Sequence, residues 1–127
     1  MKYLYIAFGG ATGSLLRHVS SSWLSGFMIN SRFPWGTFIV NLSGSLIIGL
    51  LAGINQLNPM SPTTRLFLFT GLLGGFTTYS SYALETFSLL RENQNGLAIS
   101  YVLSTSILGI LFTGLGYLLS QIGRAHV

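Results

Sequence analysis

Four long apolar stretches, separated by short polar turns, dominate the pattern of hydrophobic and polar positions along the 127-residue chain. These stretches cover residues 3–24, 35–56, 64–90 and 97–122. Each is long enough to form a helix of about 20 residues, which crosses about 30 Å of hydrocarbon. The pattern therefore predicts an all-α membrane protein with four transmembrane helices. The turns are too short to fold alone, so residues 1–127 are expected to form a single domain.

The polar turns indicate where the helices begin and end. Pro34 and Trp35 are suited to starting a helix at the membrane interface. Asn58 and Pro59 follow the second stretch and are expected to stop its helix. The third stretch differs, because its middle reads GLLGGFTT at 71–78, a run of poor helix propensity. We therefore expect a broken third helix.

Composition excludes several classes of protein. Half of the residues are hydrophobic and only 6% are charged, against about 25% in soluble domains. There is no Cys for a disulfide or a thiolate metal site, and Glu85 and Glu92 are the only acidic residues. These two lie roughly 10 Å apart along a helix, which does not suit paired acid and base catalysis at one atom. The chain is therefore not expected to be an enzyme.

The six Lys and Arg residues occur singly, so there is no basic patch to bind nucleic acid. With four spans, they divide equally between the two sides of the membrane. One side has Lys2, Arg65 and Arg124, and the other has Arg17, Arg32 and Arg91. Orientation follows the Lys and Arg difference between the sides, so an equal division predicts insertion both ways up. An antiparallel homodimer with its two-fold axis in the membrane plane is the natural assembly.

A stripe of small and polar residues runs along the second predicted helix. Thr37, Asn41 and Ser45 recur at intervals of four and share one face, which continues through Gly49 and Gly53. One interpretation is a packing seam in which Asn41 bonds to a neighbouring helix. The other is the wall of a wet cavity in which the amide donates N–H groups to an anion. An unpaired amide in the membrane costs several kcal/mol, which makes Asn41 a functional candidate.

The third stretch has the densest polar signal. A helix unwound at Gly74 and Gly75 would free backbone carbonyls for a hard cation and N–H groups for an anion. Tyr79 and Tyr82 share a face and can turn positive ring edges toward an anion, although such pairs more often serve packing. Glu85, one turn further, is either a satisfied intramembrane acid or a gate.

The fourth stretch carries a second stripe, formed by Thr105, Gly109 and Thr113 at intervals of four. Hydroxyls in membrane helices usually bond back to the carbonyl four residues earlier in the same helix. This stripe therefore matters for function only where it faces the amide stripe of the second helix.

Three runs together resemble the Fluc (CrcB) fluoride channels: GGATGSLLR at 9–17, GTFIVN at 36–41, and GGFTTYSSY at 74–82 followed by Glu85. The resemblance extends over all four predicted helices in order. It implies a dual-topology homodimer with two antiparallel fluoride pores. It also implies a structural sodium ion, Na+, at the dimer centre, held by the backbone carbonyls of Gly74 and Thr77.

The resemblance also implies roles for individual residues. The Asn41 amide would contact the permeating fluoride, and the rings of Tyr79 and Tyr82 would line each pore where the family usually has phenylalanine. Gly109 stands where many relatives keep a hydroxyl. The expected pore residues are Asn41, Tyr79, Tyr82, Ser81, Thr37 and Thr113. Arg17 and Glu85 are expected at the vestibule or gate.

The sequence thus favours a passive channel in the inner or plasma membrane that exports cytoplasmic fluoride and protects the cell from its toxicity. Its partners would be fluoride, a second copy of the chain and the lipid bilayer. The alternative is a small dual-topology, proton-coupled multidrug exporter of similar length and charge balance. Such exporters resemble one another in a carboxylate within the first span, and this chain has none there. A non-transporting assembly subunit is a third possibility.

Overall fold

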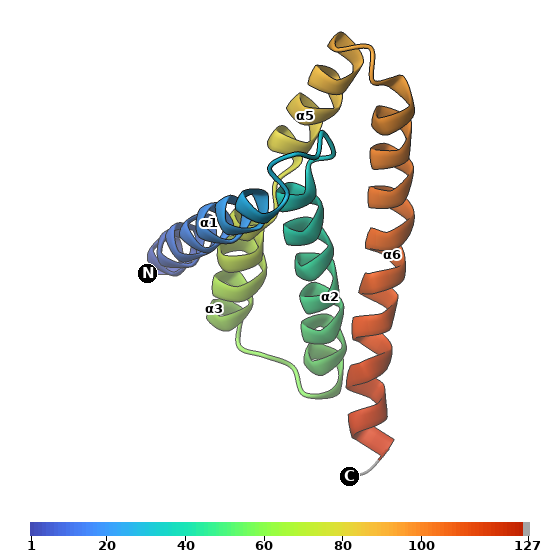
Figure 1. The fold of residues 1–127 in the computed structure, drawn as a ribbon. Coiled ribbons are helices and arrows are strands. Elements are labelled where there is room, and N and C mark those ends of the chain that lie inside the picture. Colours follow the sequence, from blue (N-terminus) through green and yellow to red (C-terminus); the bar gives the residue numbers. More distant parts are fainter. Residues whose placement is uncertain (126–127) are drawn as a thin grey trace.

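The structure, a computed structural model, describes residues 1–125, which form a bundle of helices (Figure 1). The first two helices are α1, Lys2–Phe27, and α2, Trp35–Leu57, and the last is α6, Asn95–Ala125. The third segment divides into α3, Pro62–Arg65, the π-helical η1, Leu66–Leu73, α4, Gly74–Phe76, and α5, Tyr79–Arg91. The prediction of an all-α fold with four helices, the third of them broken, is confirmed.

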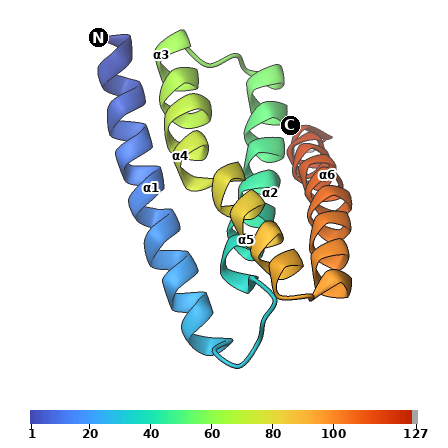
Figure 2. The same ribbon diagram turned by 90° about the horizontal axis from the view of Figure 1, so that it is seen from above.

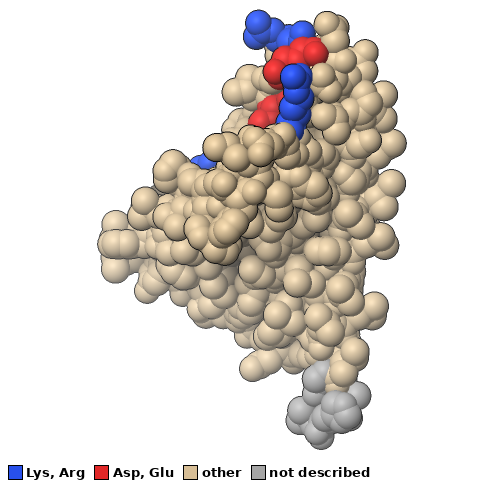
Figure 3. Space-filling view, in the orientation of Figure 1, with Lys and Arg blue, Asp and Glu red and all other residues tan. Residues whose placement is uncertain are grey.

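The helices run alternately up and down, so the connections gather at two ends. Figure 2 shows the connections 28–34 and 92–94 at one end, and the N-terminus with the connection 58–61 at the other. α2 packs along α6, while α1 packs against η1 and α4. Nearly all the charged side chains visible in Figure 3 gather at one end of the molecule.

Local sequence explains where two of the helices start. At the start of α3, the Ser61 hydroxyl accepts a hydrogen bond from the Thr64 N–H at 3.3 Å, and Pro62 takes the first helical position. At the start of α5, the Thr78 hydroxyl accepts from the Ser81 N–H at 3.2 Å. Both threonine and serine caps satisfy N–H groups that the first turn of a helix leaves free.

Glycines let the helices pack backbone against backbone. A Cβ atom at Gly75 would lie 2.6 Å from the carbonyl oxygen of Gly10 on α1, and one at Gly49 would overlap the backbone of Thr113 on α6. Close approach of this kind drives helix association where lipid removes the hydrophobic contribution. We call these contacts the glycine seams: Gly9, Gly13, Gly71 and Gly75 between α1 and the third segment, and Gly49, Gly53 and Gly116 between α2 and α6.

The outer surfaces of the bundle are apolar. Trp23 on α1 is 65% exposed and Ile110 on α6 is 74% exposed, as expected of side chains that face lipid. Within residues 1–125, α2 and α6 are the helices long and apolar enough to cross a membrane, with mean hydropathies of 1.9 and 1.8. The apolar run of α1 is interrupted by Arg17, and the helix of the third segment is interrupted by its break.

The break in the third segment falls after the glycines, not at them. Gly74 is helical, with φ −61° and ψ −37°, whereas Thr77 and Thr78 are extended, with ψ values of 154° and 123°. The expectation that the helix unwinds at Gly74 and Gly75 is therefore wrong. Gly75 is instead required for the contact with Gly10, and the extended backbone suits the β-branched threonines.

Candidate functional site

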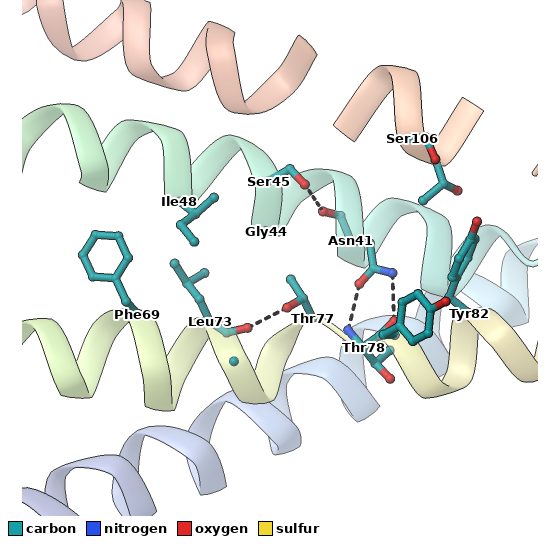
Figure 4. Close-up of a pocket in the computed structure, with 13 residues that line it drawn as sticks. Asn41, Gly44, Ser45, Ile48, Phe69, Leu73, Thr77, Thr78, Tyr82 and Ser106 are labelled. Carbon is teal, nitrogen blue, oxygen red and sulfur yellow. Dashed lines mark hydrogen bonds between the residues drawn. The ribbon is translucent and has the colours of Figure 1, made fainter. Parts of the chain in front are cut away.

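A groove of about 480 Å³ lies where α2, the third segment and α6 face one another (Figure 4). Phe69 and Ile48 line its apolar end, and Tyr82 and Ser106 lie at the opposite end. Its polar lining residues are Asn41, Ser45, Thr77, Thr78, Thr105 and Ser106. The groove therefore places the break of the third segment opposite the polar stripe of α2.

Asn41 binds the backbone at the break. Its Nδ2 donates to the Thr78 carbonyl oxygen at 3.1 Å, and its Oδ1 accepts from the Thr78 N–H at 2.9 Å. The Thr78 N–H falls in the break, where it has no helical partner, and the amide oxygen satisfies it, while the amide N–H binds the carbonyl of this N-cap residue. Nδ2 carries a second N–H, for which the described residues provide no hydrogen-bond partner. That N–H is available to a ligand in the groove.

The break leaves backbone carbonyls free. The Thr77 N–H and hydroxyl both donate to the Leu73 carbonyl, at 3.0 and 2.9 Å, which completes the helix before the break. No described residue donates a hydrogen bond to the carbonyl oxygens of Gly74 and Thr77. Gly74 is exposed and Thr77 lines the groove. Free carbonyl oxygens are hard ligands of the kind that Na+ prefers, so these two residues fit the expected cation site.

Arg17 also contacts the third segment. From α1, its half-buried side chain donates from Nε to the carbonyl oxygen of Gly75 at 3.1 Å. An arginine within a membrane helix is costly unless its charge is paired or hydrogen-bonded, and this contact supplies a partner. The structure thus places Arg17 beside the break, and its expected position at a vestibule or gate stays a prediction.

Three tyrosine rings follow one another from the groove into the bundle. The centroids of Tyr79 and Tyr82 are 5.7 Å apart, and those of Tyr82 and Tyr101 are 5.1 Å apart in an edge-on arrangement. Tyr79 is 79% exposed, whereas Tyr101 is fully buried. Within the described part of the chain, the hydroxyls of Tyr79 and Tyr82 have no hydrogen-bond partner, so both phenols are free to face a ligand or a second protomer.

Glu85 lies beyond the three rings. The Tyr101 hydroxyl donates to Glu85 Oε1 at 3.5 Å, and the Thr37 side chain lies near the same carboxylate. Glu85 also lines a second cavity, of about 460 Å³, together with Arg32 and Glu92. Glu85 therefore lies between Tyr101 and the cavity that Arg32 and Glu92 line.

Three expected pore residues do not line the groove. Thr37 is buried on α2 near Glu85, with 8% exposure. The Thr113 hydroxyl bonds back to the Gly109 carbonyl at 2.9 Å, as hydroxyls in membrane helices commonly do. Ser81 lies in the first turn of α5, where its N–H is capped by Thr78.

Two residues of α6 belong to the site although neither was among the expected pore residues: Thr105, which the sequence placed in the polar stripe of the fourth helix, and Tyr101, to which it gave no role. Thr105 lines the groove, and its buried hydroxyl has no partner within residues 1–125. Tyr101 precedes it by one helical turn and bonds Glu85. The four-residue spacing from Tyr101 through Thr105 to Gly109 was the available signal. Gly109 itself faces α2, because a Cβ there would lie 3.6 Å from the Ser45 hydroxyl.

Comparison with known proteins identifies the family of the chain. Residues 4–117 match the family described as "CrcB-like protein, Camphor Resistance (CrcB)". The "Fluoride-specific ion channel FluC" of Thermus thermophilus is 44% identical over 116 residues, which is 91% of each chain. Proteins of the same name from Methylobacillus flagellatus and Helicobacter acinonychis are each 44% identical, over 90% and 94% of each chain. The chain therefore belongs to the CrcB family of membrane proteins.

Proposed function

We propose that this chain forms a fluoride-specific ion channel that lets cytoplasmic fluoride leave the cell passively. The observation that carries this function is the 44% identity to fluoride-specific channels over 91% of each chain. The groove supports it, because the polar residues of α2, the break and α6 line one cavity. The chain is a channel protein and not an enzyme.

The physical problem for such a channel is that fluoride holds its hydration shell strongly. A narrow pathway replaces that shell with several donors in succession, each weak enough to release the ion. The free N–H of Asn41 and the unpartnered hydroxyl of Thr105 are two such donors within the groove. The positive ring edges of Tyr79 and Tyr82 would supply two more contacts.

The other expected residues are assigned to the route beyond the rings. Glu85, with Tyr101 and Thr37, would control passage between the groove and the cavity that Arg32 lines. Ser81 would offer its hydroxyl from the first turn of α5. Thr113, whose hydroxyl bonds its own helix, would serve the contact between α2 and α6.

The functional unit would be an antiparallel homodimer. Three positive residues on each side of the membrane favour neither orientation, so both would coexist in the cell membrane. Tyr79 is 79% exposed and its hydroxyl is free, which suits a position facing water or a partner better than one facing lipid. A second protomer would cover the groove of the first and give two pores related by the two-fold axis.

A structural Na+ would join the two protomers at their breaks. The free carbonyl oxygens of Gly74 and Thr77 supply two ligands from each chain, with no acidic side chain required. The ion would supply a fixed positive charge that holds four carbonyl dipoles together. Asn41 and Thr78 keep the backbone of the break in the conformation that exposes these oxygens.

Purified protein in liposomes tests this function. Vesicles loaded with potassium fluoride are made permeable to K+ with valinomycin, and external fluoride is followed with an electrode. Rapid fluoride release, with chloride retained under the same conditions, is the expected result. Proton-coupled uptake of a cationic drug would point instead to an exporter, and no transport by dimeric protein would point to an assembly subunit.

A further inference from the structure

Arg17 reaches the backbone of another helix immediately before the break. Its Nε donates to the Gly75 carbonyl oxygen at 3.1 Å, across 58 positions of sequence. The backbones of α1 and α4 are already close at this contact, because a Cβ at Gly75 would lie 2.6 Å from the Gly10 carbonyl oxygen. α1 therefore holds Gly75 through both a backbone contact and a charged hydrogen bond.

The break is thus held from two sides. Asn41 on α2 takes the N–H and the carbonyl of Thr78, and Arg17 on α1 takes the carbonyl of Gly75. The oxygens of Gly74 and Thr77 remain free between and beside these contacts. Gly74 faces open space, since a Cβ there would meet only the Phe69 carbonyl oxygen, at 3.6 Å.

We propose that Arg17 is a positioning residue for the cation site, because its bond to Gly75 fixes the direction in which the neighbouring carbonyls point. The proposal rests on the proposed function. Two consecutive glycines have more backbone freedom than any other pair, so the peptide groups of Gly74 and Gly75 need an external restraint. A hydrogen bond from a charged donor is roughly twice as strong as a neutral one, which makes the guanidinium an effective restraint.

The test must keep the charge balance that sets topology. Arg17→Gln is therefore combined with Arg65→Gln, which removes one positive charge from the opposite side. The matched control combines Arg91→Gln with Arg65→Gln. It removes the same number of charges from each side, but Arg91 lies exposed in the last turn of α5, away from the break.

The measurement is the fraction of dimer found by size-exclusion chromatography as Na+ is replaced by N-methylglucamine at constant ionic strength. Fluoride efflux is recorded in parallel. We expect the wild type and the control to reach half-maximal dimer at the same Na+ concentration. The Arg17→Gln pair should need at least tenfold more Na+. Arg17→Lys keeps the charge but not the planar fork of the guanidinium. Its dimer should need a Na+ concentration between that of the wild type and that of the Arg17→Gln pair.

Three outcomes would overturn the proposal. If the Arg17→Gln pair matches the control, the bond to Gly75 does not position the site. If no Na+ concentration restores its dimer and Arg17→Lys behaves identically, Arg17 is needed for folding alone. If the wild-type dimer itself is indifferent to Na+, the cation site fails, and the role of Arg17 fails with it. Fluoride efflux by that indifferent dimer would still uphold the channel function.

Discussion

Replacing Asn41 with aspartate tests whether the groove is an anion pathway. The substituted side chain keeps its size and keeps the oxygen that accepts the Thr78 N–H, now at 2.9 Å. It loses the Nδ2 group that donates to the Thr78 carbonyl at 3.1 Å, so two acceptors face each other. It also places a negative charge in the wall of the groove.

The two effects of Asn41→Asp differ in size. The Thr78 carbonyl is left without its donor, which costs about 1–3 kcal/mol of stability. An anion passing about 4 Å from the carboxylate meets a repulsion of about 4 kcal/mol at an effective dielectric constant of 20. At 1.4 kcal/mol for each factor of ten, that repulsion slows permeation by about a thousandfold. Transport should therefore suffer far more than assembly.

The assay is valinomycin-driven fluoride efflux from liposomes, after size-exclusion chromatography has confirmed a folded dimer. Asn55→Asp is the matched control, because it makes the same exchange on α2 outside the groove. Asn55 Oδ1 accepts from the Met60 N–H at 2.8 Å, and an aspartate oxygen keeps that bond. We expect near-normal efflux from the control and at least a hundredfold loss from Asn41→Asp. Normal efflux from dimeric Asn41→Asp would show that Asn41 serves only the packing of α2 against the third segment.

Three other predictions follow from the structure. Two lysines added near the C-terminus should give one fixed orientation, which reporter fusions would detect, and a fixed orientation in the unmodified chain would contradict the antiparallel dimer. Tyr79→Phe and Tyr82→Phe should keep most of the fluoride efflux because they keep the ring edge, whereas isoleucine at either position should abolish it. Full efflux by the isoleucine variants would show that neither ring contributes to the pore. Gly49→Val should cost several kcal/mol of stability and lower the thermal midpoint of the dimer, because its Cβ would overlap the Thr113 backbone. Gly96→Ala, whose Cβ meets no atom within 4 Å, should leave the midpoint unchanged, and equal midpoints for the two variants would refute the packing role of the glycine seam.

The sequence was sufficient to predict features that depend on local chemistry. Pro34 and Trp35 mark the start of α2, and Asn58 marks its end, because proline and polar residues act on the backbone wherever they stand. Asn41 was also identifiable, since a mid-membrane amide requires partners. Its bidentate contact with Thr78 uses one N–H for packing and leaves the second N–H free, so a packing role and a ligand-binding role are compatible in one side chain.

Features that depend on which helices meet were not predictable. Two glycines in sequence favour a helix break, but Gly75 is helical and packs closely against Gly10. The break is found at Thr77 instead. Thr113 and Thr105 have equivalent positions in the same stripe. Their different places along α6 put Thr105 beside the groove, while the backbone of Thr113, about two turns further along, meets Gly49 of α2.

The glycine seams also determine how this small protein can change during evolution. A single methyl group at Gly13 or Gly116 would overlap the backbone of the neighbouring helix, so no other residue fits there. Leu103 and Ile110, which are 54% and 74% exposed on the outer face of α6, can exchange for any apolar side chain of similar size. Substitution tolerance should therefore rise and fall with the 3.6-residue period of each helix. The chain can adapt to a new lipid composition without disturbing the faces that assemble its pore.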